Sequence, residues 1–394
     1  MIYVYIYIQM NNYEELKEII ISNYEFNEVI DEEQINTIIK EHITNYKQST
    51  SDNEYLKNAN EYLLSNNIRH IINEHVNSIH LIQYKKKQVD FLQSLILPKQ
   101  RTEGWYKMRE TRLTASSLAT ALDKDKYKSK YKFIYDKINN TPYEKNEILE
   151  HGIKYEEIAT QFYEHMNNVK ILEFGMIPHP QFNMFGASPD GICSNDSPTE
   201  YIGRMLEIKC PPKRKFTKTV PEHYWMQIQG QLQCCELIDC DFLQVKISDY
   251  NSYEDYSKDI YLENDNIVIG YTTNKLPKGC IIDYIDEGDN HQYLYPGLFK
   301  SDNELNSWIK SKTDWINENN YKLNKTNWWK IERYECTLVT KDDKWWSTNI
   351  SNIIQFWIDM EYYKLNPQEL ESKVNKSKKV VYISNKIDTD KCLL

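Results

Sequence analysis

The sequence lacks any apolar run long enough to cross a membrane, which argues against a membrane-spanning helix. Its first residues, Met1–Ile8, lack the basic leader and the small-residue cleavage site of a signal peptide. Tyrosine and isoleucine alternate there instead, and such alternation predicts a β-strand. With 40% hydrophobic and 27% charged residues, the composition is that of a soluble globular protein. We therefore expect an intracellular protein that is not secreted.

The eight cysteines form no CxxC pair and have no regular spacing. Without a secretory signal, we expect reduced thiols. Five of them lie near the candidate site described below: Cys193, Cys210, Cys234, Cys235 and Cys240. An iron–sulfur cluster is one interpretation of this group. Small buried residues on strands and a helix are the favoured one, because cluster ligands normally form tighter motifs.

The sequence has no excess of basic residues: 48 Lys and Arg stand against 58 Asp and Glu, for a net charge of −10. A nucleic-acid-binding protein usually carries positive charge. The charge here is uneven, however, because residues 1–80 hold 13 acidic and 5 basic residues, a net −8. The remainder is close to neutral. Such a domain can bind DNA through a local basic groove, since only the local field acts on the phosphates.

The length of 394 residues allows two or three domains. Residues 1–95 are predicted to form an acidic, mainly helical segment, because apolar residues recur there at helical spacing. Ser49–Asn53 is predicted to be a linker. Residues 96–365 are expected to form one domain with a Trp-rich C-terminal extension, and 366–394 a mobile, Lys-rich tail.

The middle of the chain alternates between helical and strand patterns. A helix is predicted over residues 147–167 and another over 222–238. Strands are predicted at 170–177, 183–193, 203–210 and 241–248, the third ending at a Pro-Pro pair. This order predicts an α/β fold with a mixed central sheet flanked by helices.

Seven of the nine tryptophans lie beyond residue 300. The pattern predicts a strand around residues 328–339 and a closing helix around 345–360. Stacking on DNA bases is one interpretation of these aromatic residues. Core packing is the favoured one for a cluster at helical spacing.

The strongest chemical signal is an aspartate in a turn followed by a strand with a glutamate and a lysine. Asp190 lies between a proline and a glycine, which fixes a turn. Glu207 and Lys209 are two apart on a strand and therefore share a face, while Ile208 packs on the other. The Ile208 backbone carbonyl is left as a further ligand. Oxygen ligands of this kind suit Mg²⁺, which would polarise a phosphate and acidify a bound water.

Two helical residues are candidates to complete this site. Glu156 lies at the edge of the buried stripe of the helix over 147–167, whereas Glu157 shares a face with polar residues and is expected to face solvent. Gln227 shares a face with Tyr224 and Gln231 on the later helix, and it is predicted to hold the attacking water or a phosphate oxygen.

Basic and hydroxyl side chains before and after these residues suggest phosphate contacts. Ser116, or Thr114, is expected to cap a helix that starts near residue 117, with Arg109 nearby. Lys213 and Arg214 follow the strand of Glu207 in a basic loop. Lysines at two-residue spacing over 124–132 are expected to form a solvated face, with contacts to a DNA backbone as the alternative.

Taken in order, these residues resemble the YqaJ viral recombinase family, the lambda-exonuclease-like branch of the PD-(D/E)xK nucleases. The resemblance rests on Arg109 with Ser116, Glu156, the Ser-Pro-Asp-Gly turn of Asp190, Glu207-Ile-Lys209, and the helix of Gln227. The resemblance covers about residues 103–249, and a weaker resemblance continues through the Trp-rich region to about residue 363.

The resemblance implies a restriction-endonuclease-like core and a Mg²⁺-dependent 5′→3′ exonuclease on double-stranded DNA, with Mn²⁺ as a substitute. It implies that Asp190, Glu207 and Glu156 are metal ligands, that Lys209 is catalytic and that Gln227 assists. It implies that Arg109 and Ser116 contact a 5′-phosphate. A strand-annealing partner and a homo-oligomer are further expectations. A viral origin would place the protein in the cytoplasm or nucleus of an infected cell.

Two other functions stay open at this point. A structure-selective endonuclease or resolvase would share the same motifs. A catalytically silent DNA-binding scaffold is the alternative outside the enzymes, and the presence of every polar site residue argues against it.

Overall fold

The computed structural model describes residues 13–23, 32–46, 54–141, 147–213, 216 and 218–377. The chain divides into two compact units, residues 1–87 and 88–394. The functional division predicted near residue 95 stays a prediction. The expected strand at Met1–Ile8 and the expected linker at Ser49–Asn53 lie outside the described residues.

The described residues of the first unit are helical. This unit contains α2 (Tyr13–Asn23), α3 (Glu32–Tyr46) and the greater part of α4 (Glu54–Ser94). Its core consists of isoleucines that recur at helical spacing: Ile20, Ile35, Ile38, Ile39, Ile68, Ile71 and Ile72. Packing of these apolar stripes, rather than intrinsic helix propensity, holds such helices together.

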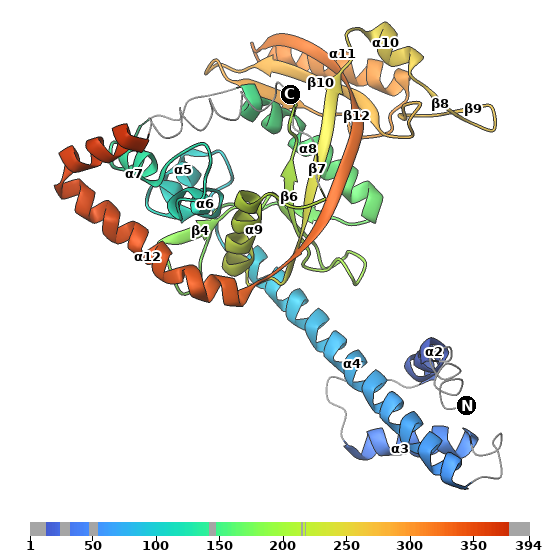
Figure 1. Ribbon diagram of the computed structural model, residues 1–394. Helices are drawn as coiled ribbons and strands as arrows, with labels where there is room; N and C mark the ends of the chain where they lie inside the picture. Colours follow the sequence, from blue (N-terminus) through green and yellow to red (C-terminus); the bar gives the residue numbers. More distant parts are fainter. Residues whose placement is uncertain are drawn as a thin grey trace, which may run out of the picture. The chain divides into compact units, whose positions relative to one another are not determined.

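The second unit is built on a mixed sheet of seven strands within the described residues, in the order β11-β10-β12-β7-β6-β5-β2. Only β6 and β7 run parallel among these neighbours. The long strand β12 runs beside β7 (Figure 1). The bounds are β2 Ile171–Leu172, β5 Gly191–Cys193, β6 Met205–Lys209, β7 Asp239–Asp249, β10 Lys278–Ile285, β11 His291–Leu294 and β12 Lys322–Thr340. The predicted α/β class with a mixed central sheet is confirmed.

Two predicted strands are each divided between two sheets. The expected strand at 170–177 is β2 followed by β3 (Ile177–Pro178), and that at 183–193 is β4 (Phe185–Ala187) followed by β5. A small sheet has the order β1-β4-β3, with β1 at Leu113–Thr114. The first division falls at Gly175, where a Cβ would lie 2.1 Å from the Pro98 carbonyl oxygen. The second falls at the turn that carries Asp190.

Helices cover both faces of the main sheet. On one face, α8 (Glu147–Asn167) packs its stripe of Tyr155, Ile158 and Phe162 against Ile208. On the other, Ile228 and Leu232 of α9 (Glu222–Cys235) pack in a core with Phe242. The predicted helix at 147–167 has the predicted bounds. Helix α9 ends three residues earlier than predicted, because Glu236 adopts a left-handed conformation with φ +50° that stops the helix.

Further elements surround this layered core. They are α5 (Glu103–Glu110), η2 (Ala115–Ser117), α6 (Leu118–Ala121), α7 (Lys130–Ile138), α10 (Tyr253–Lys258), β8 (Tyr261–Glu263), β9 (Asn266–Val268), α11 (Asp302–Glu318) and α12 (Asp343–Leu365). The strand and helix predicted in the Trp-rich region correspond to β12 and α12. Within the described residues, no helix has both the length and the apolar character needed to cross a membrane.

The tail departs from expectation. Residues 367–377 are helical, and Leu370 and Val374 are buried in the core that includes α12. The prediction of a mobile tail is wrong for these residues, because two apolar side chains one helical turn apart anchor them. Residues 378–394 lie outside the described residues.

Candidate active site

Strand β6 presents alternating side chains to the two faces of the main sheet. Leu206 and Ile208 pack in the core with α8. Glu207 and Lys209 point to the opposite face, where they meet α9. The predicted shared face of Glu207 and Lys209, with Ile208 behind them, is therefore confirmed.

Glu207 is fully buried, and its carboxylate is held by donors. Lys209 pairs with Oε1, which also accepts from Gln227 Nε2 at 2.7 Å. Gln231 Nε2 donates to Oε2 at 2.6 Å. The sequence placed Gln231 on the face of Gln227, four residues further along α9, but assigned it no role. Both amides together fix the orientation of the Glu207 carboxylate.

Asp190 lies where β5 and β6 separate. Strand β5 begins at Gly191 opposite Leu206, so the edge of β6 beyond Leu206 faces the turn rather than a paired strand. Asp190 Oδ2 accepts a hydrogen bond from the Ile208 backbone N–H at 2.7 Å. Since the N–H and C=O of one strand residue point to the same edge, the Ile208 carbonyl also lies on the Asp190 side.

The charges in this cluster do not balance. Burial, and then the carboxylates of Glu207 and Glu156, raise the pKa of Asp190 well above its usual range. Burial lowers the pKa of Lys209, but Glu207 and Asp190 outweigh it and leave that pKa above its usual range. Lys209 is therefore an ammonium at neutral pH, and the carboxylates around it are in excess.

Glu156 joins this cluster from α8. Arg101 Nη2 donates to Oε1 at 3.0 Å and to Oε2 at 2.9 Å, and Lys209 and Glu207 are further electrostatic neighbours. Burial raises the pKa of Glu156, although Arg101 and Lys209 oppose this. Glu157 is half-buried rather than solvent-facing, and its Oε1 accepts from Gln161 Nε2. Glu156, unlike Glu157, therefore has Lys209 and Glu207 among its electrostatic neighbours.

Sequence reasoning missed the residues that hold the Asp190 turn in place. Gln100 Nε2 donates to the Pro189 carbonyl at 3.1 Å, and Trp105 Nε1 donates to Ser188 Oγ at 2.9 Å. Arg101, the partner of Glu156, was also missed. These residues lie in a turn and at a helix start, where no periodic pattern marks an inward-facing side chain.

The predicted phosphate contacts lie on neighbouring elements. Arg109 is on α5, with its guanidinium 4.3 Å from the centre of the Trp105 ring. Ser116 is exposed on η2, and its hydroxyl bonds that of Thr114. Thr114 occupies the N-cap of η2 and Ser117 that of α6, and neither makes a side-chain capping bond, so the predicted capping by Thr114 or Ser116 is wrong. The 5′-phosphate contact itself stays a prediction.

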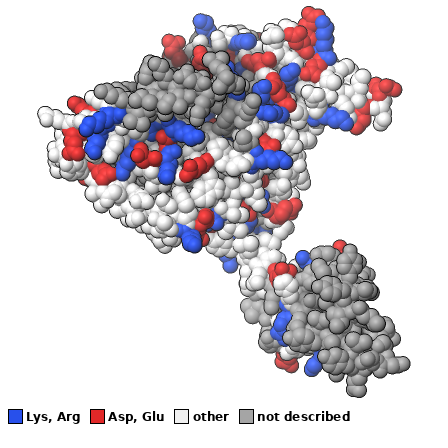
Figure 2. All heavy atoms as spheres, in the orientation of Figure 1, with Lys and Arg blue, Asp and Glu red and all other residues white. Residues whose placement is uncertain are grey.

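The basic stretches have different surroundings. Lys213 is exposed just beyond β6, and Arg214 lies outside the described residues. Lys128 and Lys132 both pair with Asp136, and Lys130 pairs with Asp359. Figure 2 shows Lys and Arg interspersed with carboxylates on the face it draws. These lysines therefore neutralise neighbouring carboxylates.

The prediction of buried thiols is confirmed for the five cysteines near the site. Of the seven tryptophans beyond residue 300, three are buried, three are partly buried and one is exposed. Trp329, Trp346 and Trp357 are buried, whereas Trp315 is 37% exposed. Within the described residues seven cysteines have free thiols, and Cys336 is the exposed one. Burial raises the pKa of Cys193 and Cys235 to about 12, so both are protonated thiols in the metal-free protein.

A divalent cation suits the carboxylate cluster. Over the ranges that the structure describes, no three His, Cys, Asp or Glu side chains already converge as a metal site. Each carboxylate is turned to a protein donor instead: Asp190 to an amide, Glu156 to Arg101, Glu207 to Lys209. Burial, and then the carboxylates of Glu207 and Glu156, raise the pKa of Asp190, and a hard cation bound to these oxygen atoms would offset the repulsion between the carboxylates.

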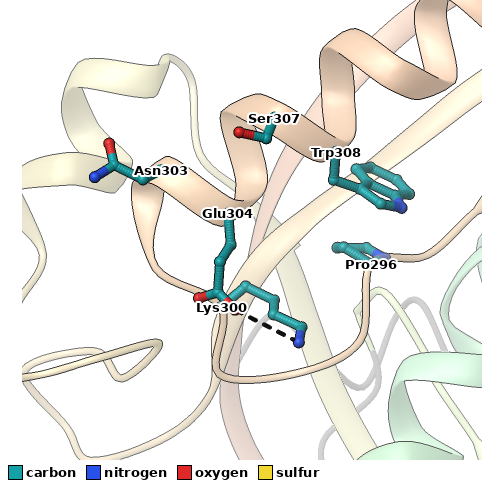
Figure 3. A pocket seen from close by; sticks show the side chains of 6 residues that line it. All are labelled: Pro296, Lys300, Asn303, Glu304, Ser307 and Trp308. Carbon is teal, nitrogen blue, oxygen red and sulfur yellow. Dashed lines mark ion pairs between the residues drawn. The ribbon is translucent and has the colours of Figure 1, made fainter.

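An open hollow lies elsewhere, on α11 and the segment before it. Its lining consists of Pro296, Lys300, Asn303, Glu304, Ser307 and Trp308 (Figure 3). Lys300 and Glu304 form an exposed ion pair at 3.7 Å. None of the predicted site residues lines this hollow. The candidate active site is the carboxylate cluster, because the predicted residues meet there and not at the hollow.

Comparisons with known proteins give one family model, which matches about a third of the chain. Residues 104–237 match the model of the YqaJ-like viral recombinase domain. An uncharacterized protein of Acanthamoeba polyphaga mimivirus is 31% identical over 325 residues, which cover 75% of this chain and 58% of that protein. A protein of African swine fever virus is 27% identical over 160 residues, 34% of this chain and 46% of that protein. The chain thus spans about half to three fifths of the length of these relatives.

Two solved structures are also similar. An alkaline exonuclease (LHK-Exo) from Laribacter hongkongensis, in complex with dAMP, has a TM-score of 0.39 and 20% identity. That match covers 71% of this chain and 100% of the exonuclease. A phage-related exonuclease from Haemophilus somnus has a TM-score of 0.34 and 11% identity, over 66% of this chain and 96% of that one.

Proposed function

Because residues 104–237 match the model of the YqaJ-like viral recombinase domain, we propose that the chain is a Mg²⁺-dependent deoxyribonuclease. Its proposed activity is 5′→3′ exonuclease cleavage of double-stranded DNA during viral recombination or repair. The observation that carries the proposal is the convergence of Asp190, Glu207 and Lys209 at the point where β5 and β6 separate. The structure-selective endonuclease is the alternative that experiment has to exclude.

The residues that would hold the cation are Asp190, Glu207, Glu156 and the Ile208 carbonyl. When bound, Mg²⁺ would polarise the scissile phosphate and lower the pKa of a coordinated water. In the metal-free protein Glu207 and Asp190 outweigh burial and raise the pKa of Lys209, so that it is a cation at neutral pH. As a cation it would position the attacking water or stabilise negative charge on the phosphate. Gln227 and Gln231 orient Glu207, which keeps the carboxylate preorganised.

The first test removes the central charges. Asp190→Ala and Lys209→Ala should each reduce Mg²⁺-dependent degradation of linear duplex DNA by a factor of about 100 or more, because each removes a group that acts on the reacting phosphate. Far-UV circular dichroism should show the fold of the wild-type protein. Unchanged activity in either variant would contradict the proposed site.

A matched pair on α8 tests the choice between adjacent glutamates. Glu156→Ala should reduce the rate of DNA degradation, since Glu156 belongs to the carboxylate cluster. Glu157→Ala removes the adjacent carboxylate, which accepts a hydrogen bond from Gln161. This variant should degrade DNA at a rate within about twofold of that of the wild-type protein. Equal losses in both variants would argue for a general effect of α8 rather than a specific role for Glu156.

A comparison of linear with covalently closed circular DNA distinguishes the exonuclease from the endonuclease. An exonuclease requires an end, so the protein should degrade 5′-end-labelled linear duplex and leave covalently closed circles intact. A comparison of 5′-phosphate with 5′-hydroxyl ends adds a test of Arg109 and Ser116. Cutting of closed circles in the presence of Mg²⁺ would favour the endonuclease.

A further inference from the structure

Arg101 occupies a backbone position that an arginine rarely adopts. Lys99–Thr102 form a turn in which the Thr102 N–H donates to the Lys99 carbonyl at 3.3 Å. Within this turn Arg101 has φ +65°, in the left-handed region that favours glycine or asparagine. Local strain of this kind persists where the surrounding structure requires the side chain.

The turn is fastened to the loop of Asp190. Gln100 Nε2 donates to the Phe174 carbonyl at 2.8 Å as well as to the Pro189 carbonyl. On the other side of Arg101, Trp105 bonds the Ser188 hydroxyl. These contacts of Gln100 and Trp105 hold the backbone on both sides of Arg101 next to the Asp190 turn. The Arg101 side chain can therefore change its hydrogen-bond partner without movement of the backbone.

The guanidinium of Arg101 engages both oxygens of Glu156, which would otherwise be available to a cation. The pair is accessible to water, with 44% of the Arg101 side chain and 35% of the Glu156 side chain exposed. A DNA phosphate offers a guanidinium the same pair of anionic oxygens. Arg101 therefore competes with a metal ion for the oxygens of Glu156, and Glu156 competes with a DNA phosphate for the guanidinium of Arg101.

We propose that Arg101 is a positioning residue that couples DNA binding to metal binding. In the DNA-free protein it holds Glu156. A DNA phosphate then takes over the guanidinium and leaves Glu156 to the metal ion. The coupling is reciprocal: Mg²⁺ bound at Glu156 releases Arg101 and strengthens binding of DNA, and DNA strengthens binding of Mg²⁺ by the same factor. This inference rests on the proposed nuclease function.

The first arm of the test measures Mg²⁺ binding by isothermal titration calorimetry, without DNA. Arg101→Gln removes the competitor for Glu156 and should lower the Kd for Mg²⁺ about fivefold or more. Arg101→Gly should do the same while relieving the positive φ, which guards against a folding defect in the first variant. The matched control is Lys107→Gln, which removes an exposed cation of α5 paired with Glu103 and should leave the Kd unchanged.

The second arm measures the coupling itself, by fluorescence anisotropy of a short 5′-phosphorylated duplex with phosphorothioate linkages that resist cleavage. The ratio of the DNA Kd values without and with Mg²⁺ should exceed one in the wild-type protein, and it should fall about fivefold or more in Arg101→Gln. A loss of charge alone would weaken DNA binding equally under both conditions and leave the ratio unchanged.

The outcomes separate the two proposals. If the wild-type protein binds Mg²⁺ and degrades DNA but Arg101→Gln has the wild-type Kd for Mg²⁺ or the wild-type ratio, the coupling is overturned and the nuclease function stands. If the wild-type protein neither binds Mg²⁺ nor degrades DNA, both proposals are overturned.

Discussion

At the scale of single residues, Asp190 and Glu207 differ in what surrounds their carboxylates. Glu207 accepts from Lys209, Gln227 and Gln231 and is fully buried. Asp190 accepts from one backbone amide and faces the negative charges of Glu207 and Glu156. The same substitution, carboxylate to amide, should therefore change stability in opposite directions at the two positions.

Asp190→Asn should raise the free energy of unfolding of the metal-free protein by roughly 1 kcal/mol, because it removes a repelled charge and keeps an oxygen for the Ile208 amide. Glu207→Gln should lower it by roughly 2 kcal/mol, because the new amide donor faces donors and Lys209 loses its counterion. Urea denaturation monitored by tryptophan fluorescence measures both. Shifts of the same sign would contradict this description of the cluster.

At the scale of elements, the sequence predicts the presence of helices and strands better than the positions where they end. The stripe of Tyr155, Ile158 and Phe162 marks α8 because a 21-residue helix repeats its signal over several turns. The strands around Gly175 and Asp190 were predicted too long. Their ends are decided by the approach of the Pro98 backbone and by pairing in different sheets, neither of which is local in sequence.

The same distinction between regular elements and turns separates the site residues that could be predicted from those that could not. Glu207, Lys209 and Gln227 could be predicted because they stand on a strand and a helix whose periods fix their faces. Gln100 and Arg101 could not, because a turn has no period and their partners lie 55 to 89 residues away. Long-range hydrogen bonds of this kind become visible only once the chain has folded.

The junction of α5 with α7 leads to a prediction about pH. Lys137 Nζ donates to the last carbonyls of α5, those of Arg109 at 3.2 Å and Glu110 at 2.8 Å. Burial, and then the charge of Arg109, lower its pKa from 10.5 to about 8. Between these values the unfolded chain binds a proton that the folded protein does not, so this residue makes stability rise with pH from about 8 to 10.5.

Lys137→Met removes this titrating group. The free energy of unfolding of the wild-type protein should therefore increase relative to that of the variant as pH rises from about 8 to 10.5, and the difference should be flat below that window. Chemical denaturation of both proteins at half-unit pH intervals measures it. A difference that is constant from pH 7 to 10.5 would show that burial does not lower the pKa of Lys137.

At the scale of the whole molecule, the two units have separate hydrophobic cores. Ile68, Ile71 and Ile72 belong to a core formed within residues 1–87, and the carboxylate cluster belongs to the second unit. We expect units with separate cores to unfold as separate cooperative transitions, so the free energies of unfolding predicted above for the Asp190, Glu207 and Lys137 variants are those of the second unit. Differential scanning calorimetry should resolve two transitions, and Mg²⁺ should raise the midpoint of only one, since a ligand stabilises the unit that binds it.

Two variants assign these transitions. Ile71→Ala leaves a cavity in the core of residues 1–87 and should lower the free energy of unfolding of that unit by about 2–5 kcal/mol. The midpoint of the Mg²⁺-insensitive transition should fall accordingly. Asp190→Ala should abolish the effect of Mg²⁺ on the other. If Ile71→Ala instead lowers both midpoints together, the units unfold as one. The acidic helical unit would then contribute to the stability of the proposed nuclease unit, and it could not be removed without loss of activity.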